Sequence, residues 1–312
     1  MKLTLKLPES NTHSYPDDCL TPIQENNPNM KYWITKSGMF CKTNISRMKK
    51  FAEPLVNESK IISYLKDKPT SPVINPPIKS ELNGDNIVIT QKAIYGGDFF
   101  DYVSNSNHGI LSAIAFLKCI RDSLIYFVEH KIIFNDFALE NIMIKNSDNL
   151  DLTLVDFGCS KIYSEDKEYM WNLSDFISIR TNQLSPDIIL NHYELKIMSR
   201  DEIFNLMLKK DMFSIGVILY STLFGTELWS SIEYRYPDEK IADLNVLHNK
   251  IANFISEHPN HPSNSILKII VGLLQIKIND IISLDKFINM VNDLDVNDRS
   301  TSQPSYKKRR IN

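Results

Sequence analysis

Apolar and polar positions change their spacing along this chain, and the change separates a strand-rich part from a helix-rich part. Lys31–Thr35 and Met39–Asn44 flank a Lys-Ser-Gly turn and predict one β-hairpin, while Glu81 to Gln91 predicts a second around an Asn-Gly pair. Between the two hairpins, the apolar residues of Pro54–Leu65 recur at helical spacing. The N-terminal part is therefore predicted to be a small sheet with one helix.

The rest of the chain is dominated by helical periodicity. Ile110–Glu129 carries apolar residues at the period of a helix and is predicted to be a central buried helix. Further helices are predicted at Ser265–Gln275 and Ser283–Val291. The two patterns together predict an α+β chain whose C-terminal part is larger and mainly helical.

The composition is that of a soluble globular protein. The chain has 312 residues, 43% apolar and 23% charged, which is enough for one large domain or two lobes. A net charge of −3 gives no overall basic field, so a nucleic-acid partner is not predicted. The four cysteines form no Cys-x-x-Cys pair and predict reduced packing residues in an intracellular protein. Ile269 to Ile276, the most apolar run, is too short to span a bilayer, so no membrane partner is predicted. The sequence does not indicate an oligomeric state.

Three oxygen-bearing side chains distinguish the stretch from Ile132 to Gly158. Asp136, Asn141 and Asp156 each follow or close a short apolar run, so each is expected at the mouth of a buried strand pair. Hard Mg²⁺ prefers oxygen ligands, and an Asn carbonyl binds it without adding a second full charge. These residue types therefore indicate a magnesium site.

An Asp, an Asn five residues later and an Asp-Phe-Gly after a hairpin resemble the catalytic core of eukaryotic-type protein kinases. The resemblance implies that Asp136 receives the proton of a substrate hydroxyl, and that Asn141 and Asp156 hold Mg²⁺ on ATP. Ser185-Pro186-Asp187 is similar to the family's Ala-Pro-Glu. Asp211–Tyr220 resembles its Asp-x-Trp-Ser-x-Gly-Val-x-Leu-Tyr helix, whose Asp caps the catalytic loop.

A strand lysine and a helical glutamate extend the resemblance. Lys42 lies inside the second strand of the first predicted hairpin, and Glu58 follows sixteen residues later in the predicted helix. In the family, such a pair positions the ATP phosphates. Without the neighbouring motifs, Lys42 would be interpreted as a solvated strand lysine and Glu58 as a surface charge of a helix. Lys49 and Lys50 are alternative candidates for the lysine of this pair.

The segment between the two parts resembles a kinase hinge. Gly96-Gly97-Asp98 before two phenylalanines is similar to the family's Gly-Gly-Asp-Leu-Phe, in which the glycines allow a turn and the Asp caps the next helix. Alignment with the family's hinge places Gln91 at the gatekeeper position. The resemblance also implies that Lys92–Ile94 offers backbone groups to adenine, with Lys92 and Ile94 as the candidate contacts.

The resemblance implies a bilobal protein-kinase-like fold. Residues 1–91 would form a small β-rich N-lobe, residues 92–293 a larger C-lobe, and residues 294–312 a disordered basic tail. The run Lys307 to Arg310 predicts either a nuclear import signal or a solvated charged end. The expected location is the cytoplasm or the nucleus.

The glycine-rich loop of the family is absent. Residues 23–30 occupy its place without any glycine, and Gln24 and Asn26 are the candidate phosphate contacts. Asn tolerates positive φ better than most residues, but Pro28 removes one backbone donor. A stiffer lid with weaker phosphate binding is therefore expected.

Three further departures concern charged groups. Phe134-Asn135 replaces His-Arg, so the cation that pairs with a phosphorylated activation loop is missing. Ala138 replaces the lysine near the γ-phosphate, which should slow transfer unless another cation such as Lys161 substitutes. Asp187 replaces a Glu, and residues 277–280 contain no equivalent of its arginine partner.

These observations leave three functional hypotheses. The first is a Ser/Thr-directed protein kinase that transfers the γ-phosphoryl group of Mg-ATP to protein substrates. The second is a pseudokinase that uses the same fold for binding or scaffolding. The third, a small-molecule phosphotransferase of the aminoglycoside kind, shares the Asp-x₄-Asn spacing but is disfavoured by Ser-Pro-Asp and the Asp211–Tyr220 motif.

The Asn/Ile/Lys-rich composition and lax motif spelling also resemble divergent kinases of large DNA viruses, among them the baculovirus protein kinases. That resemblance implies virion or nuclear proteins as substrates, and possible association with the virion.

Overall fold

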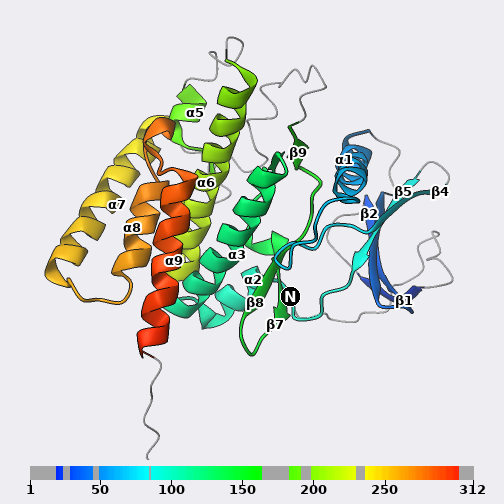
Figure 1. Ribbon diagram of the computed structural model, residues 1–312, viewed down its shortest axis with the longest axis horizontal. Coiled ribbons are helices and arrows are strands. Elements are labelled where there is room, and N and C mark those ends of the chain that lie inside the picture. Colours follow the sequence, from blue (N-terminus) through cyan, green and yellow to red (C-terminus); the bar gives the residue numbers. More distant parts are fainter. Residues whose placement is uncertain are drawn as a thin grey trace, which may run out of the picture.

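The structure, a computed structural model, has a β-sheet with one helix at one end and a bundle of helices at the other (Figure 1). It describes residues 19–23, 29–44, 49–83, 86–163, 183–190, 198–229 and 236–301.

Five antiparallel strands form the N-terminal sheet, in the order β1-β2-β3-β5-β4. The strands are β1 (Cys19–Ile23), β2 (Met30–Thr35), β3 (Met39–Asn44), β4 (Lys79–Asn83) and β5 (Asn86–Lys92). Both predicted hairpins are confirmed, as β2–β3 and β4–β5. Lys42 of β3 lies directly opposite Ile89 of β5, so the two side chains share one face of the sheet.

Helix α1 (Lys49–Leu65) packs on β3, β4 and β5. Its buried residues Leu55, Ile61 and Leu65 follow helical spacing and account for the predicted helix. The helix begins five residues before the predicted start, so Pro54 lies inside it. The sequence of its first turn begins with two lysines and carries no apolar periodicity, so the pattern predicted a later start.

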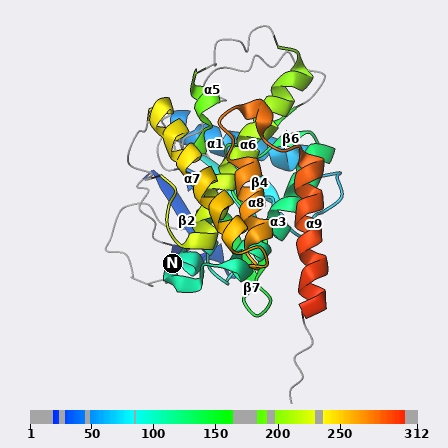
Figure 2. The ribbon, with the colours of Figure 1, turned by 90° about the vertical axis from the view of Figure 1, so that its left-hand side faces the viewer.

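The C-terminal lobe is built around helix α3 (Ile110–Glu129), whose bounds are those predicted. Phe116, Leu117, Ile120 and Phe127 are buried along it, within the main hydrophobic core. Helices α7, α8 and α9 lie side by side, with α8 in the middle (Figures 1 and 2). The helices not yet given bounds are α2 (Phe99–Tyr102), α5 (Pro186–Leu190), α6 (Arg200–Phe224), α7 (Pro237–Glu257), α8 (Asn264–Leu273) and α9 (Leu284–Thr301).

Short elements between α3 and α5 carry the motifs. Two small antiparallel pairs are formed by β6 with β9 and by β7 with β8. These strands are β6 (Ile132–Ile133), β7 (Ile142–Asn146), β8 (Asp151–Leu154) and β9 (Lys161–Ile162).

Single turns of 3₁₀-helix lie at Leu139–Asn141 and Ile278–Asp280, and a π-helical turn lies at Val103–Asn107.

Helix α6 is longer than the predicted Asp211–Tyr220. It starts at Arg200 behind a capping box, in which the Ser199 side chain accepts from the N–H of Glu202 and the Glu202 carboxylate accepts from the N–H of Ser199. It ends at Gly225, which adopts φ 71° as a left-handed cap.

Helix α9 extends into the residues that were predicted to form a tail. Helix α9 continues through Thr301, so residues 294–301 are helical. Phe287, Val291 and Leu294 are buried at successive turns, and this apolar face holds the helix on the core beyond the predicted end. Residues 302–312, with the run Lys307 to Arg310, lie outside the described residues.

Within the described ranges, no helix combines the length and apolarity needed to cross a bilayer.

Candidate active site

The β7–β8 hairpin brings two of the predicted oxygen ligands together. Ile142, which follows Asn141, pairs with Leu154, which precedes Asp156 by two residues. The N–H of Val155 donates to the carbonyl of Asn141 at 2.9 Å, so the ends of the hairpin are tied side by side. The predicted strand pair therefore places Asn141 and Asp156 at one mouth.

Asp136 joins them through the 3₁₀ turn at Leu139–Asn141. The side-chain amide of Asn141 donates to the carbonyl oxygen of Asp136 at 2.9 Å and to its carboxylate Oδ2 at 3.0 Å. The amide nitrogen of Asn141 is thus used to position Asp136. Its amide oxygen is the group that remains for a cation.

The backbone of Asp156 is in the left-handed conformation, with φ 64°. Its Oδ1 accepts from the N–H of Gly158 at 3.1 Å and from the Lys42 ammonium at 3.1 Å. The side chain is still 48% exposed, so the carboxylate combines fixed partners with access to solvent.

The ion pair predicted between Lys42 and Glu58 is present. The Lys42 Nζ lies 3.0 Å from Glu58 Oε2, and the Glu58 side chain is completely buried. Glu58 Oε1 accepts from the N–H of Phe157 at 3.1 Å. Lys42, rather than Lys49 or Lys50 at the start of α1, is the lysine that meets the glutamate and Asp156.

Burial and mutual attraction oppose each other in these three groups. Burial alone lowers the pKa of Lys42, but Asp156 and Glu58 outweigh it and raise that pKa above its ordinary value. Burial alone raises the pKa of Asp156, but the Lys42 ammonium and the Gly158 N–H lower it below its ordinary value. For Glu58 burial dominates, and it raises the pKa to about 7 against the opposing effect of Lys42.

Asn57 is a residue that sequence reasoning missed. Its side-chain amide donates to the carbonyl oxygens of Gly158 at 2.9 Å and Ser160 at 2.5 Å. Helix α1 also approaches Gly158 so closely that a Cβ at that position would lie 3.0 Å from the Cβ of Pro54. A half-buried Asn beside a Glu carries no periodic signal, so nothing in the sequence pointed to this contact.

Phe134, which stands where the family has a His, packs among aromatic side chains. It is 1% exposed, stacks on Phe127 at a centroid distance of 5.5 Å and meets the edge of Phe157, also at 5.5 Å. The ring centroids of Phe134 and Phe137 lie 4.8 Å apart. These aromatic contacts join the segments that carry Asp136 and Asp156 to α3.

The predicted cap of the catalytic loop is also present. Asp211 Oδ2 of α6 accepts from the N–H of Asn135 at 3.1 Å. Asp211 is 2% exposed, and burial raises its pKa to about 6, although Lys210 and the backbone donors of Asn135 and Phe134 oppose that shift.

Asp187 and Ala138 are two of the positions that depart from the family's pattern. Asp187 Oδ2 accepts from the N–H of Ile278 at 3.0 Å, so a backbone donor meets this carboxylate where an arginine would meet it in the family. Ala138 is buried, whereas Lys161 lies in β9 and pairs with Ile133 next to the catalytic loop.

The predicted adenine contacts lie at the end of β5, which holds Lys92, and on the connection that follows it, which holds Ile94. The carbonyl of Lys92 accepts from the side chain of Asn75 at 3.0 Å. Lys92 and Ile94 line a cavity of about 680 Å³ together with part of the Lys68–Ile78 loop. Gln91 is 7% exposed, and its Oε1 has no hydrogen-bond partner among the residues that the structure describes. Gln24 and Asn26, the predicted phosphate contacts, lie outside the described residues.

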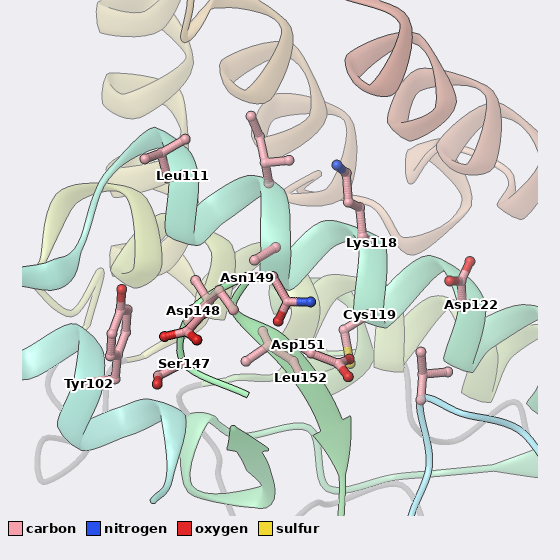
Figure 3. A pocket seen from close by; sticks show the side chains of 14 residues that line it. Tyr102, Leu111, Lys118, Cys119, Asp122, Ser147, Asp148, Asn149, Asp151 and Leu152 are labelled. Atoms are coloured by element: carbon pink, nitrogen blue, oxygen red, sulfur yellow. The ribbon is translucent and has the colours of Figure 1, made fainter. Parts of the chain in front are cut away.

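A separate hollow of about 530 Å³ lies between α3 and the β7–β8 turn (Figure 3). Figure 3 shows the side chains that line it, among them Cys119 of α3 beside Asp151 and Leu152 of β8. None of the predicted site residues lines it, so this hollow is distinct from the candidate active site.

The residues fit magnesium and a nucleotide by the chemistry of their donors. The described residues contain no cluster of three or more His, Cys, Asp and Glu that would enclose a metal by itself. Mg²⁺ characteristically takes only one or two carboxylates and completes its shell with substrate phosphates and water. The half-exposed Asp156 carboxylate and the Asn141 amide oxygen suit that role, and the orphan Gln91 Oε1 offers an acceptor.

The proteins similar to this chain include curated relatives that are named as kinases. The chain is 27% identical over 217 residues to "Serine/threonine-protein kinase atg1" of Dictyostelium discoideum, which is 68% of this chain and 28% of that protein. It is 24% identical over 143 residues to "Myosin light chain kinase family member 4" of Homo sapiens, which is 45% of this chain and 32% of that protein. The chain therefore spans less than a third of the length of either relative.

The solved structures share the fold at low identity. "Crystal structure of Rad53 kinase domain and SCD2" matches with a TM-score of 0.59 and 18% identity, over 89% of this chain and 88% of that one. "Crystal structure of Rad53 1-466 in complex with AMP-PNP" matches with a TM-score of 0.57 and 18% identity, over 88% and 64%. Both support the predicted α+β kinase fold. Residues 39–291, well over half of the chain, match the family described as "Protein kinase domain", and the chain therefore belongs to the protein kinase family.

Proposed function

We propose that this protein transfers the γ-phosphoryl group of Mg-ATP to Ser/Thr hydroxyls of protein substrates. The observation that carries the proposal is the position of Lys42, whose ammonium lies 3.0 Å from Glu58 and 3.1 Å from Asp156. This contact connects the sheet, α1 and the segment after β8 in one arrangement. A relative named as a serine/threonine-protein kinase supports the choice of acceptor.

The chain's own residues would act by position and charge. Mg-ATP, when bound, supplies the transferable phosphoryl group and the metal charge that neutralises it. Lys42, held by the buried Glu58, presents a fixed cation to phosphate oxygens. Asn141 holds the Asp136 carboxylate at 3.0 Å, where it can accept a proton from a hydroxyl. Asp156 stays ionised because its pKa is lowered.

The alternative function is a pseudokinase that binds partners with weak or no transfer. Its support is Ala138 and the absence of glycine at residues 23–30. Without a cation at position 138, less positive charge faces the transferred group. The retention of Lys42, Glu58, Asp136, Asn141 and Asp156 favours the enzyme.

The test measures binding and transfer separately. Purified protein with Mg-ATP labelled at the γ-phosphate is incubated with a basic acceptor protein, and the labelled amino acid is identified. Transfer to Ser or Thr is expected, with a nucleotide-dependent thermal shift. Asp136→Asn should abolish transfer and keep the thermal shift, because Asp136 faces the hydroxyl and not the phosphates. A thermal shift without transfer in the wild type would favour the pseudokinase, and transfer retained by Asp136→Asn would contradict the assigned base.

Location and substrate identity stay predictions. The run Lys307 to Arg310 suggests nuclear import, and the resemblance to kinases of large DNA viruses suggests virion or nuclear substrates.

A further inference from the structure

Lys210 is a lysine buried beside the catalytic loop. It lies on α6 immediately before Asp211 and has no exposed surface. Its ammonium donates to the side-chain oxygen Oδ1 of Asn135, 75 positions earlier in the chain. A lysine is almost never fully buried unless it has partners, so its presence here needs a physical reason.

Electrostatics supply that reason. Lys210 acts on the neighbouring Asp211, whose pKa it lowers against the effect of burial. It acts in the same direction on the thiol of Cys159, which follows the Asp-Phe-Gly segment. The ammonium is therefore situated among the catalytic loop, α6 and the segment after Gly158.

Asn135 connects these three segments. Its N–H donates to Asp211 Oδ2 at 3.1 Å, its side-chain amide donates to the carbonyl of Cys159 at 3.3 Å, and its Oδ1 accepts from Lys210. The residue has φ 69°, a left-handed conformation that Asn tolerates and that fixes the direction of the next peptide. The next residue is Asp136.

We propose that Lys210 is a positioning residue for phosphoryl transfer. From α6 it supplies the cation that the loop lacks at position 135, and through Asn135 it holds Asp136 in place. The inference rests on the proposed function. Lys210 would not touch the substrate. Loss of Lys210 would lower kcat, because a displaced Asp136 no longer meets the hydroxyl. The affinity for ATP would stay unchanged, because Lys42 binds the phosphates at a different place.

The test compares two adjacent lysines of the same helix. Lys210→Met removes the ammonium and keeps the length of the side chain. Lys209→Met is the matched control, because Lys209 donates instead to the carbonyl of Ile281 at the other side of α6. Lys210→Met should lower kcat by about tenfold or more, with the KM for ATP within about twofold of wild type, because small misplacements of a reacting group cost up to about 100-fold. Lys209→Met should keep kcat, and Lys210→Arg should restore most of it.

A double-variant cycle separates positioning from general destabilisation. Asn135→Gly removes the acceptor from the opposite side of the contact, together with the bond to Cys159, and glycine tolerates the φ of 69° at this position. If Lys210 acts through Asn135, then Lys210→Met lowers kcat far less in the Asn135→Gly background than in the wild type, whereas an equal loss in both backgrounds would overturn the proposal. Equal losses in Lys209→Met and Lys210→Met would also overturn it. Should Lys210→Met fail to fold, Asn135→Gly decides alone, and an unchanged kcat would refute the role.

Amide hydrogen exchange across residues 131–141 gives a readout independent of activity. Faster exchange there in Lys210→Met, but not in Lys209→Met, supports the positioning role, and unchanged exchange contradicts it. A wild-type protein that transfers no phosphate would overturn the proposed function and the kinetic role together. The exchange result would still show whether Lys210 holds the loop.

Discussion

Asn57 of α1 donates a hydrogen bond of 2.9 Å to the carbonyl oxygen of Gly158, across 101 positions of sequence. Next to it, Glu58 accepts from the N–H of Phe157 at 3.1 Å. One turn of α1 thus supplies a donor and an acceptor to consecutive residues after Asp156. The position of this helix and the conformation of that segment are therefore determined together.

We expect Asn57→Asp to weaken this connection. The aspartate has the same shape but cannot donate, and it places negative charge against the carbonyl oxygens of Gly158 and Ser160. Unmet hydrogen bonds should lower the free energy of unfolding by about 1–3 kcal/mol. Chemical denaturation measures the change, and phosphoryl transfer should fall with it.

The matched control is Asn105→Asp. Asn105 donates its side-chain amide to the carbonyl of Asp101 at an exposed site. This control should stay near wild type in both measurements. Equal behaviour of the two variants would show that the contact of Asn57 with Gly158 contributes nothing special.

Lys42→Met should destabilise the fold as well as abolish transfer. It leaves the carboxylate of Glu58, which is completely buried, without its cation. Removing one partner of a buried ion pair costs about 3–5 kcal/mol. Lys42→Met combined with Glu58→Gln should recover most of that stability, because no buried charge is left, while transfer stays absent. A double variant as unstable as the single one would mean that the penalty does not come from Glu58.

Asp211→Asn should change how stability depends on pH. The pKa of Asp211 is raised from 3.8 to about 6, so the folded protein binds a proton more tightly than the unfolded chain between these values. This group therefore makes the wild type less stable as pH rises through that window, by about 1.4 kcal/mol per pH unit. Asp211→Asn lacks the titration, so the melting temperature of the variant relative to that of the wild type should rise between about pH 4 and about pH 6. A constant difference would contradict the raised pKa.

Adjacent glycines of the hinge should respond differently to alanine. A Cβ on Gly96 would lie 2.1 Å from the carbonyl oxygen of Ile144, which is backbone and cannot yield without moving β7. A Cβ on Gly97 would meet nothing within 4 Å, but that residue has φ 86°. Gly97→Ala should therefore cost about 1 kcal/mol from conformation alone, and Gly96→Ala about 3 kcal/mol or more. Equal costs by denaturant titration would contradict the close approach of hinge and β7.

Local patterns predicted the elements that have strong periodicity. Helix α3 has the predicted bounds, because apolar residues recur along its whole length. Helix α6 was predicted only in its middle, because the first turns after Arg200 mix charged and apolar residues. Helix α9 was predicted too short, because the burial of Leu294 depends on the core that it meets.

The sequence by itself determined the chemistry of Asp136, Asn141 and Asp156, since their types and spacing are local and the β7–β8 hairpin brings them together. It also indicated the pairing of Lys42 with Glu58. Only the tertiary structure decided the contacts of Asn57 with Gly158 and of Lys210 with Asn135. The reason is physical: an Asn on a helix and a Lys before an Asp are ordinary residues, and their roles arise from partners 101 and 75 positions away that folding alone brings within hydrogen-bond distance.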